Sequence, residues 1–220
     1  MAKHLDLEEQ EQLDQLKHFW KIYGSAITGF LFAGLLILAS WNGFQYWERT
    51  QASQAATLFD EVDRIVRSGD ITKAERAFGD MKERFGSTAY AHQAGLMVAK
   101  LASESSKNDV AKSALTWVYE SSKDQGYASI ARLRLSALLI EEKSFDNAMQ
   151  VLNGEMPPEF APLVSDRRGD IAALQGKPTD ARAHYQKAFE GMDERTDYRR
   201  LVEIKLNALG GSVGSTEGSK

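Results

Sequence analysis

The sequence predicts an all-α protein in which one membrane-spanning helix near the N-terminus precedes a solenoid of helical hairpins. The 26 residues from Ile22 to Trp47 carry no charge, although 26% of the chain is charged. After Glu48 the apolar residues recur at helical spacing, and no stretch alternates as a strand would. Four alanine-centred segments also repeat at intervals of 37, 37 and 33 residues.

Residues 1–21 predict a short amphipathic head. Leu5, Leu13, Leu16 and Trp20 fall on one side at helical spacing, and most of the five acidic residues fall elsewhere. An acidic face opposes electrostatic binding to anionic lipid. A protein contact or simple solvation of this face both remain open.

Residues 22–47 are long enough to cross a ~30 Å hydrocarbon core as a tilted helix. Aromatic side chains, which favour the headgroup level, stand at both ends of this stretch: Phe19, Trp20, Tyr23, Trp41, Tyr46 and Trp47. A cleaved signal peptide would have a basic start and a shorter apolar run, so we expect the segment to be retained. A buried core helix would rarely carry so long an uncharged run.

Ser25, Gly29 and Ala33 recur every four residues within the span. This spacing predicts membrane helix packing, because small residues let a second helix approach closely; small residues are also common in any membrane helix. Basic residues on the two sides of the span nearly balance, so the positive-inside rule gives only a slight lean, from Lys17 and Lys21, to a cytoplasmic N-terminus.

The domain after the span is expected over residues 48–209. Its helix pairs are predicted at about 52–85, 88–122, 126–153 and 161–190, with a capping helix over 195–209 and a disordered tail over 210–220. On the capping helix, one face is expected to supply Tyr198, Leu201, Val202, Leu206 and Leu209.

Each repeat has an alanine and, four residues on, a larger side chain: Ala74 and Phe78, Ala111 and Leu115, Ala148 and Leu152, Ala181 and Tyr185. Twelve residues before each alanine stand Val62, Ala99, Ser136 and Gly169. Small residues on two paired helices allow close packing, and the larger residue fills the space toward the next pair. This pattern resembles the tetratricopeptide repeat, which implies a right-handed solenoid. Gly169, Ala181, Tyr185 and Ala188 match it best, whereas Glu155 occupies the position of the last alanine in the third unit.

Composition excludes several functional classes. With 24 basic and 26 acidic residues from Glu48 onward, the domain has no basic stripe that predicts nucleic-acid binding. The chain has no cysteine, its four histidines have no metal-ligand spacing, and no catalytic or phosphate-binding motif occurs. We therefore expect no enzyme, cofactor or metal site. Asp166 and Asp170 share a helical face beside Arg167 and Arg168 and are expected to be a solvated charged surface.

The stretches from Trp41 to Trp47 and from Ser165 to Ala188, behind a short head and one span, resemble the YfgM family of bacterial inner-membrane proteins. The resemblance implies a single-pass protein with a cytoplasmic N-terminus and a periplasmic repeat domain. It also implies a place beside the SecYEG translocon, where the family is thought to work with the chaperone PpiD and hand emerging chains to periplasmic chaperones. The head of this chain differs in length and in amino-acid sequence from the head expected for the family.

The first helices of the repeats are expected to line a concave partner-binding groove. Mapping the pattern places Phe59, Leu96, Ile130, Leu133, Ile140 and Leu163 at or near it. Taken singly, each of these residues is expected in the core between repeats rather than in the groove; if several are exposed together, they form an apolar surface for partner helices or unfolded client proteins. Asp63, Lys100 and Asp170 are expected at the rim.

The sequence thus predicts a membrane-anchored protein-binding module with chaperone-like duty at the translocon. The alternative is a tetratricopeptide scaffold for another envelope assembly machinery, such as cytochrome maturation or outer-membrane insertion.

Overall fold

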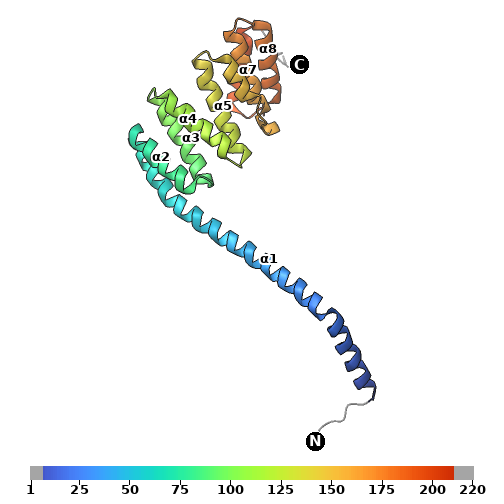
Figure 1. Ribbon diagram of the computed structural model, residues 1–220. Helices are drawn as coiled ribbons and strands as arrows, with labels where there is room; N and C mark the ends of the chain where they lie inside the picture. Colours follow the sequence, from blue (N-terminus) through green and yellow to red (C-terminus); the bar gives the residue numbers. More distant parts are fainter. Residues whose placement is uncertain (1–6, 211–220) are drawn as a thin grey trace. The chain divides into compact units, whose positions relative to one another are not determined.

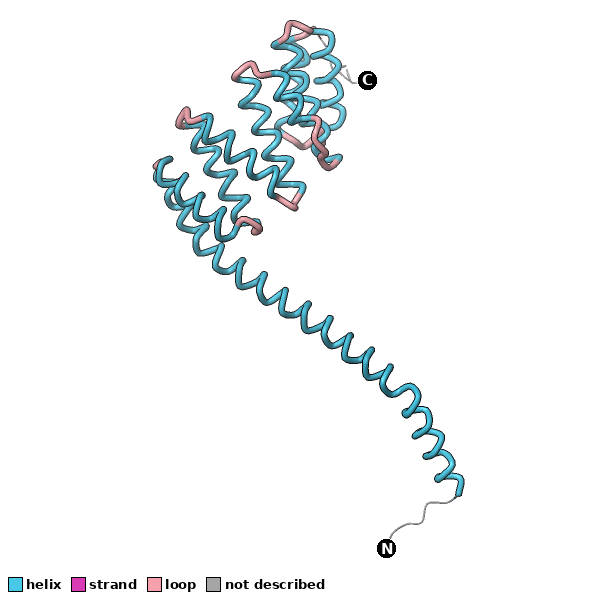
Figure 2. The backbone as a smooth tube through the Cα atoms, in the orientation of Figure 1, coloured by secondary structure: helices cyan, strands magenta, loops and turns pink. Residues whose placement is uncertain are grey.

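The computed structural model describes residues 7–210, and within that range it contains helices and turns but no strand (Figures 1 and 2). The predicted all-α class is confirmed. The chain divides into two compact units, one ending at Gln51 and the other beginning at Ala52.

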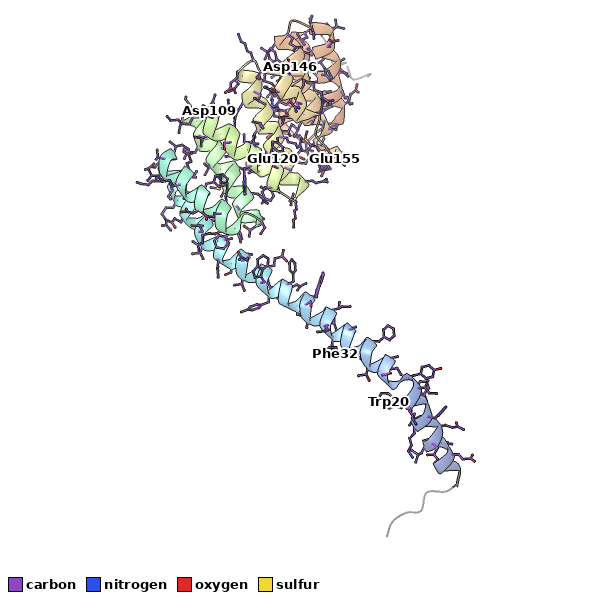
Figure 3. The ribbon with its side chains drawn as sticks, in the orientation of Figure 1. Trp20, Phe32, Asp109, Glu120, Asp146 and Glu155 are labelled. Carbon is purple, nitrogen blue, oxygen red and sulfur yellow. The ribbon has the colours of Figure 1, made fainter. Side chains whose placement is uncertain are left out.

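The first unit consists of the N-terminal part of helix α1, which begins at Leu7 and ends at Ser68. This helix is long and apolar enough to cross a membrane, and only 6% of its most apolar window is buried within the protein. Phe30 is 81% exposed, and Trp20 and Phe32 both project outward from the helix in Figure 3. A core helix would bury such side chains, so the helix has the character of a membrane span rather than of a soluble core.

Residues 7–21 of the head predicted before the span lie on the same helix. Leu13, Leu16 and Trp20 are exposed, and Leu5 lies outside the described residues.

The second unit combines the end of α1 with eight further α-helices of the described range and one 3-10 turn. Their bounds are α2 (Ile71–Phe85), α3 (Ala89–Glu104), α4 (Asn108–Ser121), α5 (Gln125–Glu141), α6 (Phe145–Leu152), η1 (Pro158–Phe160), α7 (Ala161–Leu174), α8 (Pro178–Gly191) and α9 (Asp197–Ala208). Consecutive helices from α2 to α9 pack on each other, and α5 also contacts both α3 and α7. The result is a stack of helical hairpins (Figure 1).

Short polar caps explain where several helices begin. The Asp70 carboxylate accepts a hydrogen bond from the Lys73 amide at 3.0 Å and starts α2. Asp124 caps α5 through the Gly126 amide at 2.7 Å. Such caps satisfy amides that have no partner inside the helix. Gly69, in the turn between α1 and α2, has a φ of 77°, which a residue with a Cβ adopts only with strain.

The repeating residues form the interior of the stack. The four alanines, their larger partners and the residues twelve positions earlier are all buried: Ala74, Ala111, Ala148 and Ala181; Phe78, Leu115, Leu152 and Tyr185; Val62, Ala99, Ser136 and Gly169. These positions therefore set the spacing of the helices.

Two features depart from the regular repeat. Helix α6 ends at Leu152, so Glu155 lies in the connection before η1. The third repeat therefore has no helical position that corresponds to the last alanine of the pattern. On α9, Val202 and Leu206 are fully buried, but Leu201 is 44% exposed and does not join the core as expected. No helix follows α9 among the described residues to cover that side.

Candidate protein-binding groove

A groove of about 580 Å³ opens on the second unit and is lined chiefly by the first helices of successive hairpins, α3, α5 and α7. Helices α4, η1 and α9 contribute one side chain each. The lining residues are Ala99, Lys100, Ser103, Glu104, Leu115, Ile130, Leu133, Arg134, Ala137, Leu138, Glu141, Phe160, Leu163, Arg167 and Tyr198. The volume lies in the range of protein ligand pockets.

The repeat register explains why these side chains meet. Ile130 and Leu163 stand 33 residues apart, as do Arg134 and Arg167, and 33 residues is also the spacing from Ala148 to Ala181. Residues at equivalent positions of stacked repeats point to the same surface. Helices α5 and α7 therefore each present an apolar side chain and, one turn later, an arginine.

Three of the six residues predicted for the groove, Ile130, Leu133 and Leu163, line it. Leu96 and Ile140 do not line it and belong to the hydrophobic core; Leu133 is as deeply buried as they are, at 9% exposed, but borders the groove.

Phe59 lies elsewhere and packs against the Tyr90 ring, with the ring centroids 5.6 Å apart. Of the expected rim residues, Lys100 lines the groove, whereas Asp63 pairs with Arg67 at 2.8 Å on α1.

The expectation of a solvated surface at Asp166 and Asp170 is wrong. Asp166 is 1% exposed and accepts hydrogen bonds from the Tyr198 hydroxyl at 2.7 Å and from Lys205 Nζ at 2.8 Å, both on α9. Asp170 accepts from Lys205 Nζ at 2.7 Å and from the Tyr185 hydroxyl on α8 at 2.8 Å. Asp166 is buried and Asp170 is half-buried, because their partners come from two later helices.

Arg167 completes this polar cluster. Its Nη1 atom donates to Asp170 at 3.1 Å and lies 3.5 Å from Asp166. With Lys205, the two cations balance the two carboxylates, as a buried ionic group requires. Because Arg167 and Tyr198 also line the groove, the cluster fixes one wall of it.

The surroundings of Tyr185, Tyr198 and Lys205 raise the pKa of all three groups. Burial and the neighbouring Asp170 raise the pKa of Tyr185 above its usual 10.0. Burial and the hydrogen bond to Asp166 raise the pKa of Tyr198 as well. Burial opposes the charge on Lys205, but its hydrogen bonds to Asp166 and Asp170 outweigh that effect and raise its pKa.

Ser25, Gly29 and Ala33, predicted to pack against another membrane helix, are exposed on α1. A Cβ built on Gly29 meets no atom within 4 Å. This stripe is open to a neighbouring helix, and its role stays a prediction. Elsewhere, no group of three or more His, Asp or Glu side chains is placed to hold a metal ion within the part of the chain that is described.

Comparison with known proteins gives one consistent result. A family model described as a tetratricopeptide repeat-like domain matches residues 17–211. A protein of Neisseria gonorrhoeae named "Ancillary SecYEG translocon subunit" is 33% identical over 95% of this chain and 100% of its own length. Proteins of the same name from Haemophilus influenzae and Escherichia coli are 30% and 23% identical, over 92% and 91% of this chain and 98% and 96% of their own lengths. No solved structure matches the chain significantly.

Neither the matching domain nor these relatives belong to an enzymatic family. The family match covers most of the chain, and the Neisseria and Haemophilus relatives reach 30% identity over nearly their whole lengths. The chain therefore belongs to the tetratricopeptide repeat-like family of the ancillary SecYEG translocon subunits, the YfgM family that its motifs resemble.

Proposed function

We propose that this chain is a membrane-anchored protein-binding module that associates with the SecYEG translocon. Its domain after the span binds apolar segments of partners or unfolded clients and, together with a PpiD-like chaperone, passes translocated chains to periplasmic chaperones. The N-terminus is cytoplasmic and the repeat domain periplasmic, with the span in the inner membrane. The translocon association rests on the names of the relatives.

The observation that carries the binding role is the groove. Ile130, Leu133 and Leu163 come from two different hairpins and share one hollow with Phe160 and Leu138. Apolar side chains from successive helices at one opening provide a continuous surface for an apolar segment.

The apolar span adds the second element of the proposal. Tethering a weak binding surface to the membrane raises its effective concentration toward other membrane-bound proteins without new contacts. A binding module needs no high intrinsic affinity under this arrangement.

Site-specific photocrosslinking in membranes tests the function. A photoreactive residue at Ile130 in the full chain is expected to capture translocon subunits, a membrane-anchored chaperone and chains in transit. The matched control places the same residue at Ser113, which is exposed on α4 and does not line the groove.

Adducts with cytochrome-maturation or outer-membrane-insertion proteins from Ile130 would replace the translocon proposal by the alternative scaffold. Equal adducts from Ile130 and Ser113 would refute the groove as the binding surface.

A further inference from the structure

We infer that the groove binds its partner as an amphipathic α-helix in one fixed direction, selected by basic and acidic groups that line the groove about two helical turns apart. This inference rests on the proposed function, because it requires the groove to bind an apolar segment. It adds the chemistry of that segment: an apolar stripe with acidic residues on one flank and basic residues on the other.

The acidic side of the groove lies at the carboxyl ends of two first helices. Glu104 is the last residue of α3 and Glu141 is the last residue of α5, and both line the groove. They are 37 residues apart, the same interval as between Ala111 and Ala148, so they occupy equivalent positions in successive repeats.

The helix ends strengthen this negative potential. The last turns of α3 and α5 contain no basic residue, and the carboxyl end of a helix carries a partial negative charge of about half a unit.

The basic side is formed by Arg134 and Arg167, again at equivalent positions of successive repeats. Arg167 belongs to the balanced cluster with Asp166 and Asp170. Arg134 is exposed, donates to the Leu96 carbonyl at 3.2 Å and has no ion-pair partner among residues 11–210. Its positive charge is therefore available to a bound segment.

Arg134 and Glu141 show the polarity on a single helix. They lie seven residues apart on α5 and so face the same side, about 10.5 Å apart along the axis. Glu141, like Arg134, has no ion-pair partner among residues 11–210. Lys100, the remaining cation, lies 3.8 Å from Glu104.

The separation fits a helix rather than an extended strand. A helix with its side chains is about 10–12 Å wide, which matches the distance between the basic and acidic sides. Ala137 and Leu138 lie between Arg134 and Glu141 on α5, and the apolar stripe of such a helix would face them, whereas Ile130 and Leu163 lie one turn before the arginines. Because turning the helix end to end exchanges its two flanks, opposite charges on the two sides of the groove favour one direction over the other.

Direction can be read by disulfide crosslinking, because the chain has no native cysteine. The full chain is placed in phosphatidylcholine nanodiscs with a single cysteine, either Ser103→Cys at the α3 end of the groove or Glu159→Cys beside Phe160 at the other end. The probe is a 16-residue helical peptide with a leucine stripe, glutamates on one flank, lysines on the other, and an activated cysteine at its N-terminus.

We expect the peptide to react about fivefold more at one end of the groove than at the other, as two exposed ion pairs together provide. The double change Arg134→Glu and Glu141→Arg is expected to reverse this ratio. The control Arg76→Glu and Glu83→Arg makes the same exchange at the same spacing on the exposed face of α2 and should leave the ratio unchanged. Circular dichroism and melting curves establish that the variants remain folded.

An unchanged ratio in the Arg134/Glu141 variant would overturn the inference, as would equal binding of peptides with two acidic or two basic flanks. In both results a peptide still binds the groove, so the proposed function survives. If none of the peptides reacts at either cysteine above the level seen with cysteine on α2, the groove itself is refuted and both proposals fall. A second variant, Arg134→Gln with Glu141→Gln, should bind the peptide without preference for direction.

Discussion

At Gly169 an added Cβ would lie 2.5 Å from the Tyr185 ring, closer than real Cβ contacts. The close approach of α7 and α8 at this point therefore depends on the absence of a side chain at Gly169. Its neighbours Ala181 and Ala188 are fully buried on α8. The same position holds Ala99 and Ser136 in earlier repeats, where the facing helices do not carry a tyrosine at this contact.

We expect Gly169→Ala to lower the free energy of unfolding by about 1–3 kcal/mol, the usual cost of overpacking. The control Gly79→Ala, in the interior of α2 where a Cβ meets nothing within 4 Å, should raise it by about 0.5–1 kcal/mol, since alanine is the better helix former. Thermal melts of the full chain in detergent measure both. Equal effects of the two changes would contradict the close contact at Gly169.

The polar cluster around Asp170 makes the folded chain less stable at alkaline pH. The pKa of Tyr185 and that of Lys205 are both raised in the folded chain, so the folded state holds these protons above the pH at which the unfolded chain releases them. Stability from both groups is fully present below about pH 10 and is lost as the pH rises above it.

Tyr185→Phe removes one of these protons and its hydrogen bond to the Asp170 carboxylate. We expect a lower melting temperature at pH 7, by the equivalent of about 1.5–3 kcal/mol, and a shallower further decline between pH 9 and 11 than in the unmodified chain. Melting curves across this range decide the point; parallel curves for the two proteins would show that Tyr185 does not titrate with unfolding.

His92 produces the opposite pH dependence. It is buried against Trp117, with the ring centroids 5.5 Å apart, and its Nε2 atom is buried without a hydrogen-bond partner among the residues that the structure describes. Burial lowers the pKa of His92 below 6.5, although Asp124 acts in the other direction. Its contribution to stability is present above pH 6.5 and is lost as the pH falls below that value.

His92→Leu is expected to leave stability at pH 7 unchanged or higher, because an unpaired buried nitrogen is replaced by an apolar group. The fall in melting temperature from pH 7 to pH 5 should be smaller in the variant. A fall as large as in the unmodified chain would assign the acid sensitivity to other groups.

Among the elements, the membrane span has one face of small residues whose predicted packing against another membrane helix can be tested by substitution. If Ser25, Gly29 and Ala33 contact another membrane helix, Gly29→Leu removes the close approach and should reduce co-purification with translocon subunits in mild detergent. Gly34→Leu adds the same bulk about 140° around the helix, where a Cβ also meets nothing within 4 Å, and should leave co-purification unchanged. Equal loss or equal retention in both variants would exclude a specific role for this face.

The helices themselves could be predicted because their signals are local. The uncharged run after Lys21 and the alanine spacing depend only on residues close in sequence, and both the fold class and the family resemblance are confirmed. The exposure of single groove residues could not be predicted as well. Leu96 and Ile130 both lie on first helices, but a first helix packs on several sides, so small rotations of the helix decide which side chain is buried in the core and which is open to the groove.

The burial of Asp166 could not be predicted from the sequence for a different reason. Its partners Tyr198 and Lys205 lie 32 and 39 residues later on a helix outside the repeat pattern. The arginines beside it suggested solvent exposure. Only the spacing of Tyr198 and Lys205, seven residues apart on one face of a helix, was available in the sequence as a signal.

For the whole molecule, the proposed orientation across the membrane decides on which side the groove would meet its partners. We predict that protease added to spheroplasts digests the chain after about residue 50 and leaves a protected N-terminal fragment that still contains residues 1–20. Epitope tags at the two ends, followed by immunoblotting, measure this. Digestion of the C-terminal tag only after lysis would invert the topology, and loss of the N-terminal tag before protease is added would indicate a cleaved leader.

Helix α1 contributes Ala55 and Val62, both fully buried, to the core of the second unit, and the same helix carries the apolar span. No loop separates the two units, because their boundary after Gln51 falls inside the helix. A form without the span must therefore begin before Ala55, because a start in the turn at Gly69 would leave out both buried side chains. An anchor from another protein can replace this one only by a junction upstream of Ala55, because the end of the membrane helix is also the first helix of the repeats.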